Sequence, residues 1–181
     1  MLSMFRYPLP FTSLFFALSA QAVLSTAAFG LTEKATVTYV YDGDTLKVTI
    51  GGRSEVVRLI GVDAPENHDN ERLRQQALSA SVSVKGMLDF GDRSARAVRD
   101  LAPQGTIVEL EYDATKHDKF NRLLAYVYLP DKSMLNKRIL ELGYAKLLIV
   151  PPNTRHLMDL SEAAARGKSA KRGLWSMRGF D

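Results

Sequence analysis

The 181-residue sequence contains no cysteine. Without cysteine, disulfide cross-links, thiol catalysis, cysteine-rich zinc sites and iron–sulfur clusters are all excluded, so a hydrophobic core must hold the protein together. Histidine is scarce as well, and His68, His117 and His156 lack the His-x-x-x-His spacing of a helix-borne zinc pair. Internal repeats and low-complexity tracts are also missing. The length and the 46% hydrophobic content predict one soluble globular domain.

Long apolar runs are missing too, apart from one near the N-terminus. Residues 9–18 are mostly apolar, and Ala20-Gln21-Ala22 fits the small-x-small pattern that precedes a signal-peptidase cut. We interpret residues 1–22 as a signal peptide, with cleavage as late as residue 28, and residues 23–34 as a short extension. A membrane span needs about 20 predominantly apolar residues, and polar residues interrupt this run. We therefore expect an exported protein, periplasmic or secreted, without a span in its mature chain; an uncleaved anchor is the alternative.

Basic side chains only slightly outnumber acidic ones. Losing Arg6 with the signal peptide reduces 24 Lys and Arg to 23, against 20 Asp and Glu. The distribution is less even, because residues 137–181 hold nine basic and four acidic side chains. A basic C-terminal part suits an anionic polymer, although a solvated helix surface explains it equally well.

The first third of the mature chain predicts strands. Residues 35–50 are rich in β-branched and aromatic side chains, and Asp42-Gly43-Asp44 interrupts them as a turn. Gly51-Gly52 is a favoured two-residue hairpin turn, and residues 55–62 form the next strand. We therefore expect a three-stranded meander.

Residues 69–102 change to a helical period of apolar side chains. Gly86 and Gly91 weaken the middle of this stretch, Asp92 can cap a second segment, and Pro103 ends it. Both one broken helix and two consecutive helices remain open.

The last third predicts two strands followed by two helices. The strands cover residues 106–112 and 123–129, one helix runs from Ser133 to Leu142, and an Ala-rich helix begins at Thr154. Trp175 is interpreted as a core anchor. The order of elements predicts an α+β fold, a small five-stranded Greek-key barrel of the OB type with about three helices. The domain is expected to span residues 35–177, followed by a tail at 178–181.

The stretch from Arg58 to Glu66 carries the clearest chemical signal. Its apolar strand-like run contains Arg58 and ends in Asp63-Ala64-Pro65-Glu66. A buried guanidinium is costly unless it binds a planar anion such as a carboxylate or phosphate. Arg58 and Asp63 would be about 16 Å apart in an extended strand, so a shared site requires a bend, which Gly61 permits.

Asp44 and Asp63 are candidate ligands of a metal ion. Carboxylates and backbone carbonyls suit hard cations such as calcium. The alternative for Asp44 is plain turn chemistry, since Asp-Gly-Asp is a good turn sequence. An EF-hand is excluded, because Leu46 and Arg53 occupy loop positions that need oxygen ligands.

Glu66 and Arg122 complete the candidate constellation. Pro65 restricts the backbone before Glu66, whose carboxylate could orient or deprotonate a water molecule. Arg122 lies in a polar loop and supplies a second guanidinium, as phosphoryl chemistry requires.

Four ordered motifs resemble the staphylococcal nuclease, or thermonuclease, family. They run from about residue 35 to 177, and the Gly173-Leu-Trp-Ser176 ending also fits. The motifs are Tyr41-Asp-Gly-Asp-Thr-Leu46, Val57-Arg-Leu-Ile-Gly-Val-Asp-Ala-Pro-Glu66, Asp118-Lys-Phe-Asn-Arg-Leu-Leu-Ala-Tyr126 and Asn136-Lys-Arg-Ile-Leu-Glu-Leu-Gly-Tyr-Ala145.

The resemblance implies an OB barrel that hydrolyses DNA and RNA with calcium and leaves 3′-phosphate ends. It makes Asp44, Asp63 and the Ala64 backbone carbonyl the expected calcium ligands. It also implies that Arg58 and Arg122 hold the phosphate, that Glu66 acts on the water, and that Lys119 and Phe120 contact substrate. No stable protein partner is implied, and a monomer is expected. The expected site therefore consists of Asp44, Arg58, Asp63, Ala64, Glu66, Lys119, Phe120 and Arg122.

The sequence departs from the family pattern at three places. Residues 67–91 are longer than the prototype's loop, Phe120 replaces a tyrosine, and residues 147–150 replace tyrosines that stack on the nucleotide. The alternatives are a non-catalytic OB-fold module that binds nucleic acid or protein in the cell envelope, and an anchored scaffold. Survival of both arginines and all three carboxylates argues against the module.

Overall fold

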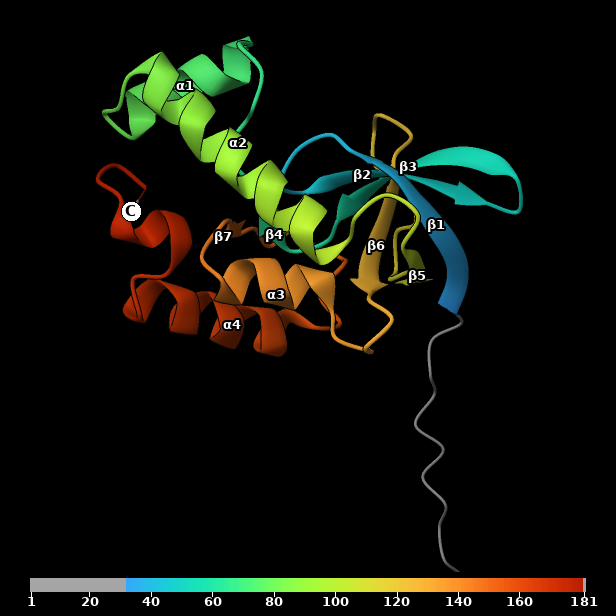
Figure 1. Ribbon diagram of the computed structural model, residues 1–181. Helices are drawn as coiled ribbons and strands as arrows, with labels where there is room; N and C mark the ends of the chain where they lie inside the picture. The colour runs from blue at the N-terminus through green and yellow to red at the C-terminus, as the bar shows by residue number, and fades with distance from the viewer. Residues whose placement is uncertain (1–31, 181) are drawn as a thin grey trace, which may run out of the picture.

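The computed structural model describes residues 32–180, so the predicted signal peptide and most of the extension lie outside the described residues. Within this range, none of the helices has the length and apolar character that crossing a membrane would need. Five strands close into a barrel in the order β1-β2-β3-β6-β5 (Figure 1). The barrel confirms the predicted α+β fold class.

The barrel strands are short. Their bounds are β1 (Thr32–Val40), β2 (Thr45–Ile50), β3 (Arg53–Leu59), β5 (Ile107–Glu111) and β6 (Leu123–Tyr128). The predicted meander is β1-β2-β3, joined by antiparallel pairing, and β3 pairs with β6 in parallel to help close the barrel. Gly51 and Gly52 both have positive φ, +54° and +83°, which explains why glycines form this hairpin turn.

The predicted helical stretch 69–102 is two helices, α1 (Glu71–Ser79) and α2 (Val84–Leu101). Ser83 caps α2 by accepting a hydrogen bond from Gly86 N, so the prediction that Asp92 caps a second segment is wrong. Gly91 lies inside α2, where an added Cβ would collide with the backbone of Glu66. The glycine that weakened the helix prediction is therefore what lets α2 pass so close to Glu66.

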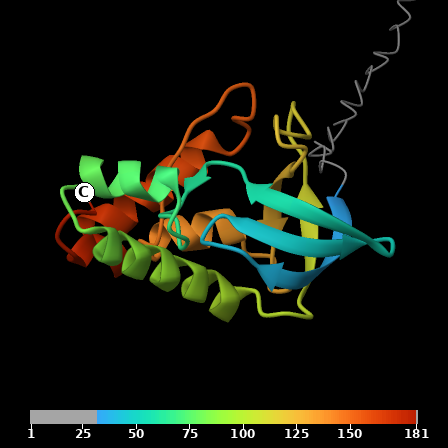
Figure 2. The same cartoon turned by 90° about the horizontal axis from the view of Figure 1, so that it is seen from above.

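The C-terminal helices begin later than predicted. α3 (Leu135–Glu141) has Met134 at its N-cap, because Ser133 bonds with Asp131 instead, and α4 (Leu157–Ser169) begins three residues after Thr154. Both views show the helices gathered at one end of the barrel, with α3 and α4 side by side (Figures 1 and 2). A two-stranded ladder of β4 (Val62–Asp63) and β7 (Lys146–Leu147) lies between the barrel and these helices.

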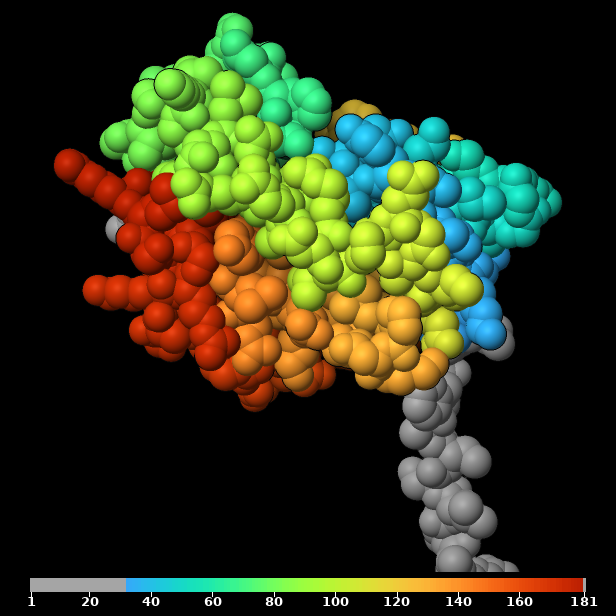
Figure 3. Space-filling view, viewed as in Figure 1, coloured from blue at the N-terminus to red at the C-terminus, as the bar shows by residue number. Residues whose placement is uncertain are grey.

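A second, smaller core lies beside the barrel core. It is formed by α1, α2 and the C-terminal segment, which make one lobe in the space-filling view (Figure 3). Trp175, in the 3₁₀ helix Gly173–Ser176, packs against this cluster, as predicted for a core anchor. Phe180 lies in the stretch predicted as a tail and is buried here. The members are Leu73, Ala77, Met87, Phe90, Leu174 and Phe180.

Replacing Asn136 with Ala is expected to lower the free energy of unfolding by about 3 kcal/mol, because three buried backbone groups lose a partner. The Asn136 amide accepts from Val127 N at 2.9 Å and donates to Ile60 O at 2.8 Å and Ala125 O at 3.2 Å. Chemical denaturation measures the change, and Lys137→Ala on the same helix is the control. A loss below about 1 kcal/mol would show that this amide does not join α3 to the barrel.

Candidate functional site

The predicted site residues come from three parts of the chain that converge beside the barrel. These are the turn between β1 and β2, the stretch that runs from β3 through a bend and β4 to Glu66, and the loop between β5 and β6. Gly61 turns the chain at the bend with a φ of +79°. The bend that the sequence required for Arg58 and Asp63 to meet is therefore present.

Arg58 is 7% exposed and lies at the centre of this convergence. Its Nη1 donates to Val62 O at 2.6 Å and to Leu59 O at 3.1 Å, and its Nη2 lies 3.1 Å from Asp44 Oδ2. The same Nη2 is 3.8 Å from Asp63 Oδ1. The buried guanidinium thus has the anionic partners that its burial demands, and they are the two predicted metal ligands.

The two aspartates of the first turn have separate roles. Asp42 Oδ1 accepts the hydrogen bond from Asp44 N at 2.9 Å, which is the turn interaction. Asp44 instead points inward and is buried, and its Oδ2 accepts from Ala64 N at 2.9 Å. The turn explanation therefore accounts for Asp42 and leaves Asp44 available to the site.

The carboxylates of Asp42, Asp44 and Asp63 lie close together in the site. Burial raises the pKa of Asp42 to about 7, and the charge of Asp44 adds to the effect. Burial also raises the pKa of Asp63, opposed by Arg72 and reinforced by Asp44. Carboxylates that resist ionisation because they are buried and lie close to another carboxylate form a place where added positive charge is stabilised.

Glu66 is held at the start of the α1 region. Its Oε2 accepts from Asn70 Nδ2 at 3.0 Å, and its Oε1 lies 3.2 Å from Arg72 Nε. Its backbone N–H donates to Gln76 Oε1 at 3.0 Å. Asn70 and Arg72 therefore fix the Glu66 side chain, and Gln76 holds its backbone, which Gly91 of α2 passes closely.

Arg72 is the site residue that the sequence did not reveal. Its Nη2 lies 2.6 Å from Asp63 Oδ1 while its Nε contacts Glu66, so one guanidinium joins a predicted metal ligand to the predicted base. Nothing in its local pattern distinguishes Arg72 from other helix-surface arginines. The only signal in the sequence was the length of residues 67–91, which form a longer segment than the corresponding loop of the family prototype.

Arg122 faces the site across a cavity of about 480 Å³ that Arg58 and Arg72 also line. Its Nε and Nη2 both lie 2.7 Å from Asp118 Oδ2, which fixes its guanidinium. Lys119 lines the cavity as well, whereas Phe120 is 68% exposed and stands beside Lys119 and Arg122. The lining residues are Arg58, Leu59, Ile60, Gly61, Val62, Arg72, Thr115, His117, Asp118, Lys119, Arg122, Leu124, Leu148, Val150, Pro151, Pro152 and Asn153.

The oxygen donors at this site fit a hard cation. Within residues 32–180, no three Asp, Glu, His or Cys side chains cluster closely enough to hold a metal ion. Instead, Arg58 stands between Asp44 and Asp63, and Arg72 between Asp63 and Glu66, so guanidinium groups provide the positive charge there. Two carboxylates and the adjacent Ala64 carbonyl are the donor types that calcium prefers.

Comparisons with known proteins agree on one family. A family model described as "Staphylococcal nuclease homologue" matches residues 56–177. Over 144 residues the chain is 33% identical to a thermonuclease of Staphylococcus intermedius, covering 79% of this chain and 76% of that protein. It is also 34% identical over 153 residues to an uncharacterized protein of Bacillus anthracis, covering 82% of this chain. A third relative is the SPbeta prophage-derived endonuclease YokF of Bacillus subtilis (strain 168), 31% identical over 141 residues and 77% of this chain.

The match covers less than two thirds of two of these relatives. It spans 64% of the Bacillus anthracis protein and 43% of the Bacillus subtilis endonuclease. The remainder of those two proteins lies outside the match.

Proposed function

Because the chain belongs to the staphylococcal nuclease family, we propose that it is a calcium-dependent nuclease that hydrolyses phosphodiester bonds in DNA and RNA and leaves 3′-phosphate ends. The observation that carries the proposal is the meeting of Arg58, Asp44 and Asp63 beside the cavity that Arg122 lines. Two fixed guanidinium groups facing one cavity form a binding site for a phosphodiester.

Each residue then has a role in hydrolysis. Arg58 and Arg122 bind the phosphate oxygens, and Glu66 orients a water molecule and accepts its proton as the oxygen attacks phosphorus. The bond from phosphorus to the 5′ oxygen breaks, the 5′ oxygen takes a proton, and the phosphate stays on the 3′ side. Calcium, held by Asp44, Asp63 and the Ala64 carbonyl, would supply positive charge to the phosphate and lower the pKa of the water.

General-base catalysis by Glu66 cannot account for an enzyme by itself. A positioned base contributes about 10²–10⁴-fold, whereas enzymes accelerate reactions by about 10⁶-fold or more. The rest must come from electrostatic stabilisation of the charge that spreads over the phosphate oxygens. The arginines are suited to this because Asp118 fixes Arg122, and Val62 O and Asp44 fix Arg58 before substrate arrives.

The proposed function is tested by digesting heat-denatured DNA and RNA with purified protein in calcium, and again with EDTA. We expect rapid digestion in calcium and loss of digestion in EDTA. Digestion that EDTA leaves unchanged would refute the role of the metal. Salt-dependent DNA binding with no cleavage in calcium would instead identify the non-catalytic module.

We also propose that the protein is exported and acts as a monomer. The apolar run at residues 9–18 and the small-x-small pattern at 20–22 support export. Mass measurement of the protein from its native host tests this, with a mature start after residue 22 to 28 as the expected result. Retention of Met1 or of residues 1–22 would favour the anchored alternative.

Replacing Arg72 with Gln is expected to tighten calcium binding about 3- to 30-fold, because the cation no longer competes with a guanidinium for Asp63. Isothermal calorimetry measures the affinity without any substrate. Arg74→Gln is the control, since it removes the same charge from the same helix, where Arg74 pairs with Asp69. Equal calcium affinities in the two variants would contradict competition by Arg72.

A further inference from the structure

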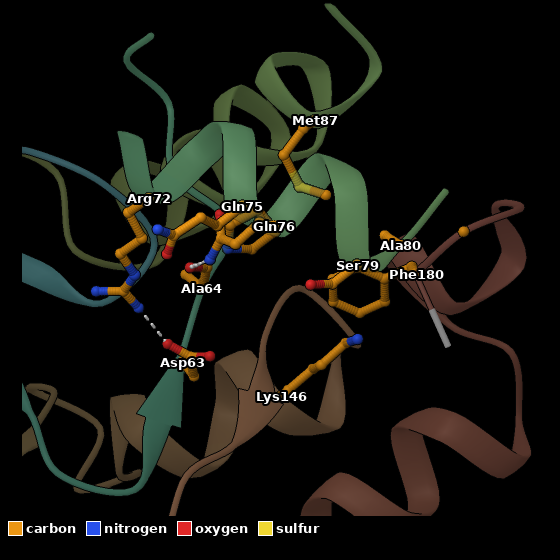
Figure 4. Close-up of a pocket in the computed structure, with 12 residues that line it drawn as sticks. Asp63, Ala64, Arg72, Gln75, Gln76, Ser79, Ala80, Met87, Lys146 and Phe180 are labelled. Atoms are coloured by element: carbon orange, nitrogen blue, oxygen red, sulfur yellow. Dashed lines mark hydrogen bonds and ion pairs between the residues drawn. The ribbon is translucent and has the colours of Figure 1, made fainter. Parts of the chain in front are cut away.

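A second cavity of about 390 Å³ opens on the other side of Asp63 (Figure 4). It is formed by α1, the segment from Asp63 to Pro65, Met87 of α2, Lys146 of β7 and Gly179-Phe180. Its polar lining residues are Asp63, Arg72, Gln75, Gln76, Ser79 and Lys146. The stretch 67–91, longer than the family loop, therefore builds most of one wall of a cavity beside the proposed site.

The two sides of this cavity differ in character. Arg72 and Asp63 lie at one side, and Lys146 lies with Phe180 at the opposite side (Figure 4). The Lys146 ammonium is 5.1 Å from the centre of the Phe180 ring, and Met87 adds further apolar surface. The two cations suit a phosphate group, the amide and hydroxyl groups suit the edges of a base, and the apolar wall suits the face of a base. The volume lies within the range of small-ligand pockets, about 300–1,000 Å³.

The cavity is joined to the proposed catalytic residues. Arg72 lines both cavities, and Asp63 lines this one while it faces Arg58 of the other. In the β4–β7 ladder Lys146 is paired directly with Asp63, so this cation lies one strand away from the site. A nucleic-acid strand that crosses the site would run from the cavity lined by Arg122, past Arg72, into this second cavity.

α1, which forms this wall, and its N-cap are bonded to the segment that carries Asp63 and Glu66. Gln76 accepts from Glu66 N at 3.0 Å, Asn70 donates to Glu66 at 3.0 Å, and Arg72 pairs with Asp63. A ligand under α1 would therefore be held at a fixed position relative to Glu66.

We propose that this cavity binds a nucleotide of the substrate strand on the side of the cleaved phosphodiester opposite to the Arg122 cavity. The inference rests on the proposed nuclease function. The strand would then be held on both sides of the bond that is cleaved.

The test compares two tryptophan substitutions at the end of α1. Ser79 lines the cavity, whereas its neighbour Leu78 is 80% exposed and is not among the lining residues. Ser79→Trp and Leu78→Trp are each combined with Glu66→Gln, which is expected to slow cleavage about 10²–10⁴-fold during the binding measurement. Binding of thymidine 5′-monophosphate and of tetrathymidylate is measured by calorimetry in calcium, and thermal melting checks that each variant is folded.

We expect tetrathymidylate to bind the parent at least about tenfold more tightly than the mononucleotide, since each further stacked base strengthens binding about 5- to 150-fold. Ser79→Trp should remove this gain without changing mononucleotide affinity, and Leu78→Trp should keep it. Equal tetrathymidylate affinities in the two tryptophan variants would overturn the cavity proposal. Absence of binding of either probe to the parent would instead contradict the nuclease function.

If Ser79→Trp does not fold, Gln75→Glu decides the matter. Gln75 is exposed and lines the cavity, so the substitution places a negative charge there without added volume. A tetrathymidylate affinity at least about fivefold weaker, with unchanged mononucleotide affinity, is the expected result. An unchanged tetrathymidylate affinity would overturn the proposal.

Discussion

Replacing Glu66 with Gln should lower kcat for DNA hydrolysis about 10²–10⁴-fold, the usual contribution of a positioned general base. The amide is nearly the same size, so it can still accept from Asn70, but it cannot take a proton from water. Because Glu66 binds no phosphate in this proposal, KM should change little. Initial rates over a range of DNA concentrations separate the two parameters.

The matched control for this substitution is Glu71→Gln. Glu71 lies five residues later, in the first turn of α1, and its carboxylate contacts Gln75 at 3.3 Å on an exposed surface. Both variants lose one negative charge from the same region. A Glu66 variant that keeps wild-type kcat, or a Glu71 variant that loses as much, would remove Glu66 from the mechanism.

Much of the site could be predicted because its signals are local in the sequence. Arg58 was conspicuous since a strand otherwise made of buried apolar residues cannot carry an unpaired guanidinium, and its partners are indeed carboxylates. Gly61 was recognised as a residue that permits the bend between Arg58 and Asp63, and it has a φ of +79°. The barrel was predicted from the order of the elements, since β-branched and aromatic runs and turn residues marked the strands.

The parts that could not be predicted depend on contacts between distant segments. Asp92 is of a residue type that caps helices, but it lies inside α2. The helix does not restart there, because Gly91 lets α2 continue past the Glu66 backbone without a break. Arg72 looked like a surface residue because only the folded chain brings α1 against Asp63. Helix propensity indicated that a helix exists near residue 72, but not which face meets the site.

Replacing Arg58 with Ala should have the largest combined effect, abolishing detectable hydrolysis and lowering the free energy of unfolding by about 3–5 kcal/mol. The phosphate loses one of its two arginines. Asp44, whose side chain is 7% exposed, loses its ion-pair partner and remains buried with only the Thr45 hydroxyl and Ala64 N–H as donors. Urea denaturation in EDTA measures the stability, and single-turnover digestion measures the activity.

Arg58→Lys is the informative control, because it keeps the charge and loses the two-pronged contact with Val62 O and Asp44. It should recover most of the stability and little of the activity, since a single ammonium cannot bind two phosphate oxygens in a fixed geometry.

Calcium distinguishes a structural role of Arg58 from the proposed one. If Asp44 and Asp63 hold the ion, calcium at 100 times its Kd should return about 2.7 kcal/mol to the Arg58→Ala variant. The released carboxylates should also bind the ion more tightly than in the parent. A variant that calcium fails to stabilise would show that Arg58 only balances buried charge and that these carboxylates are not the metal site.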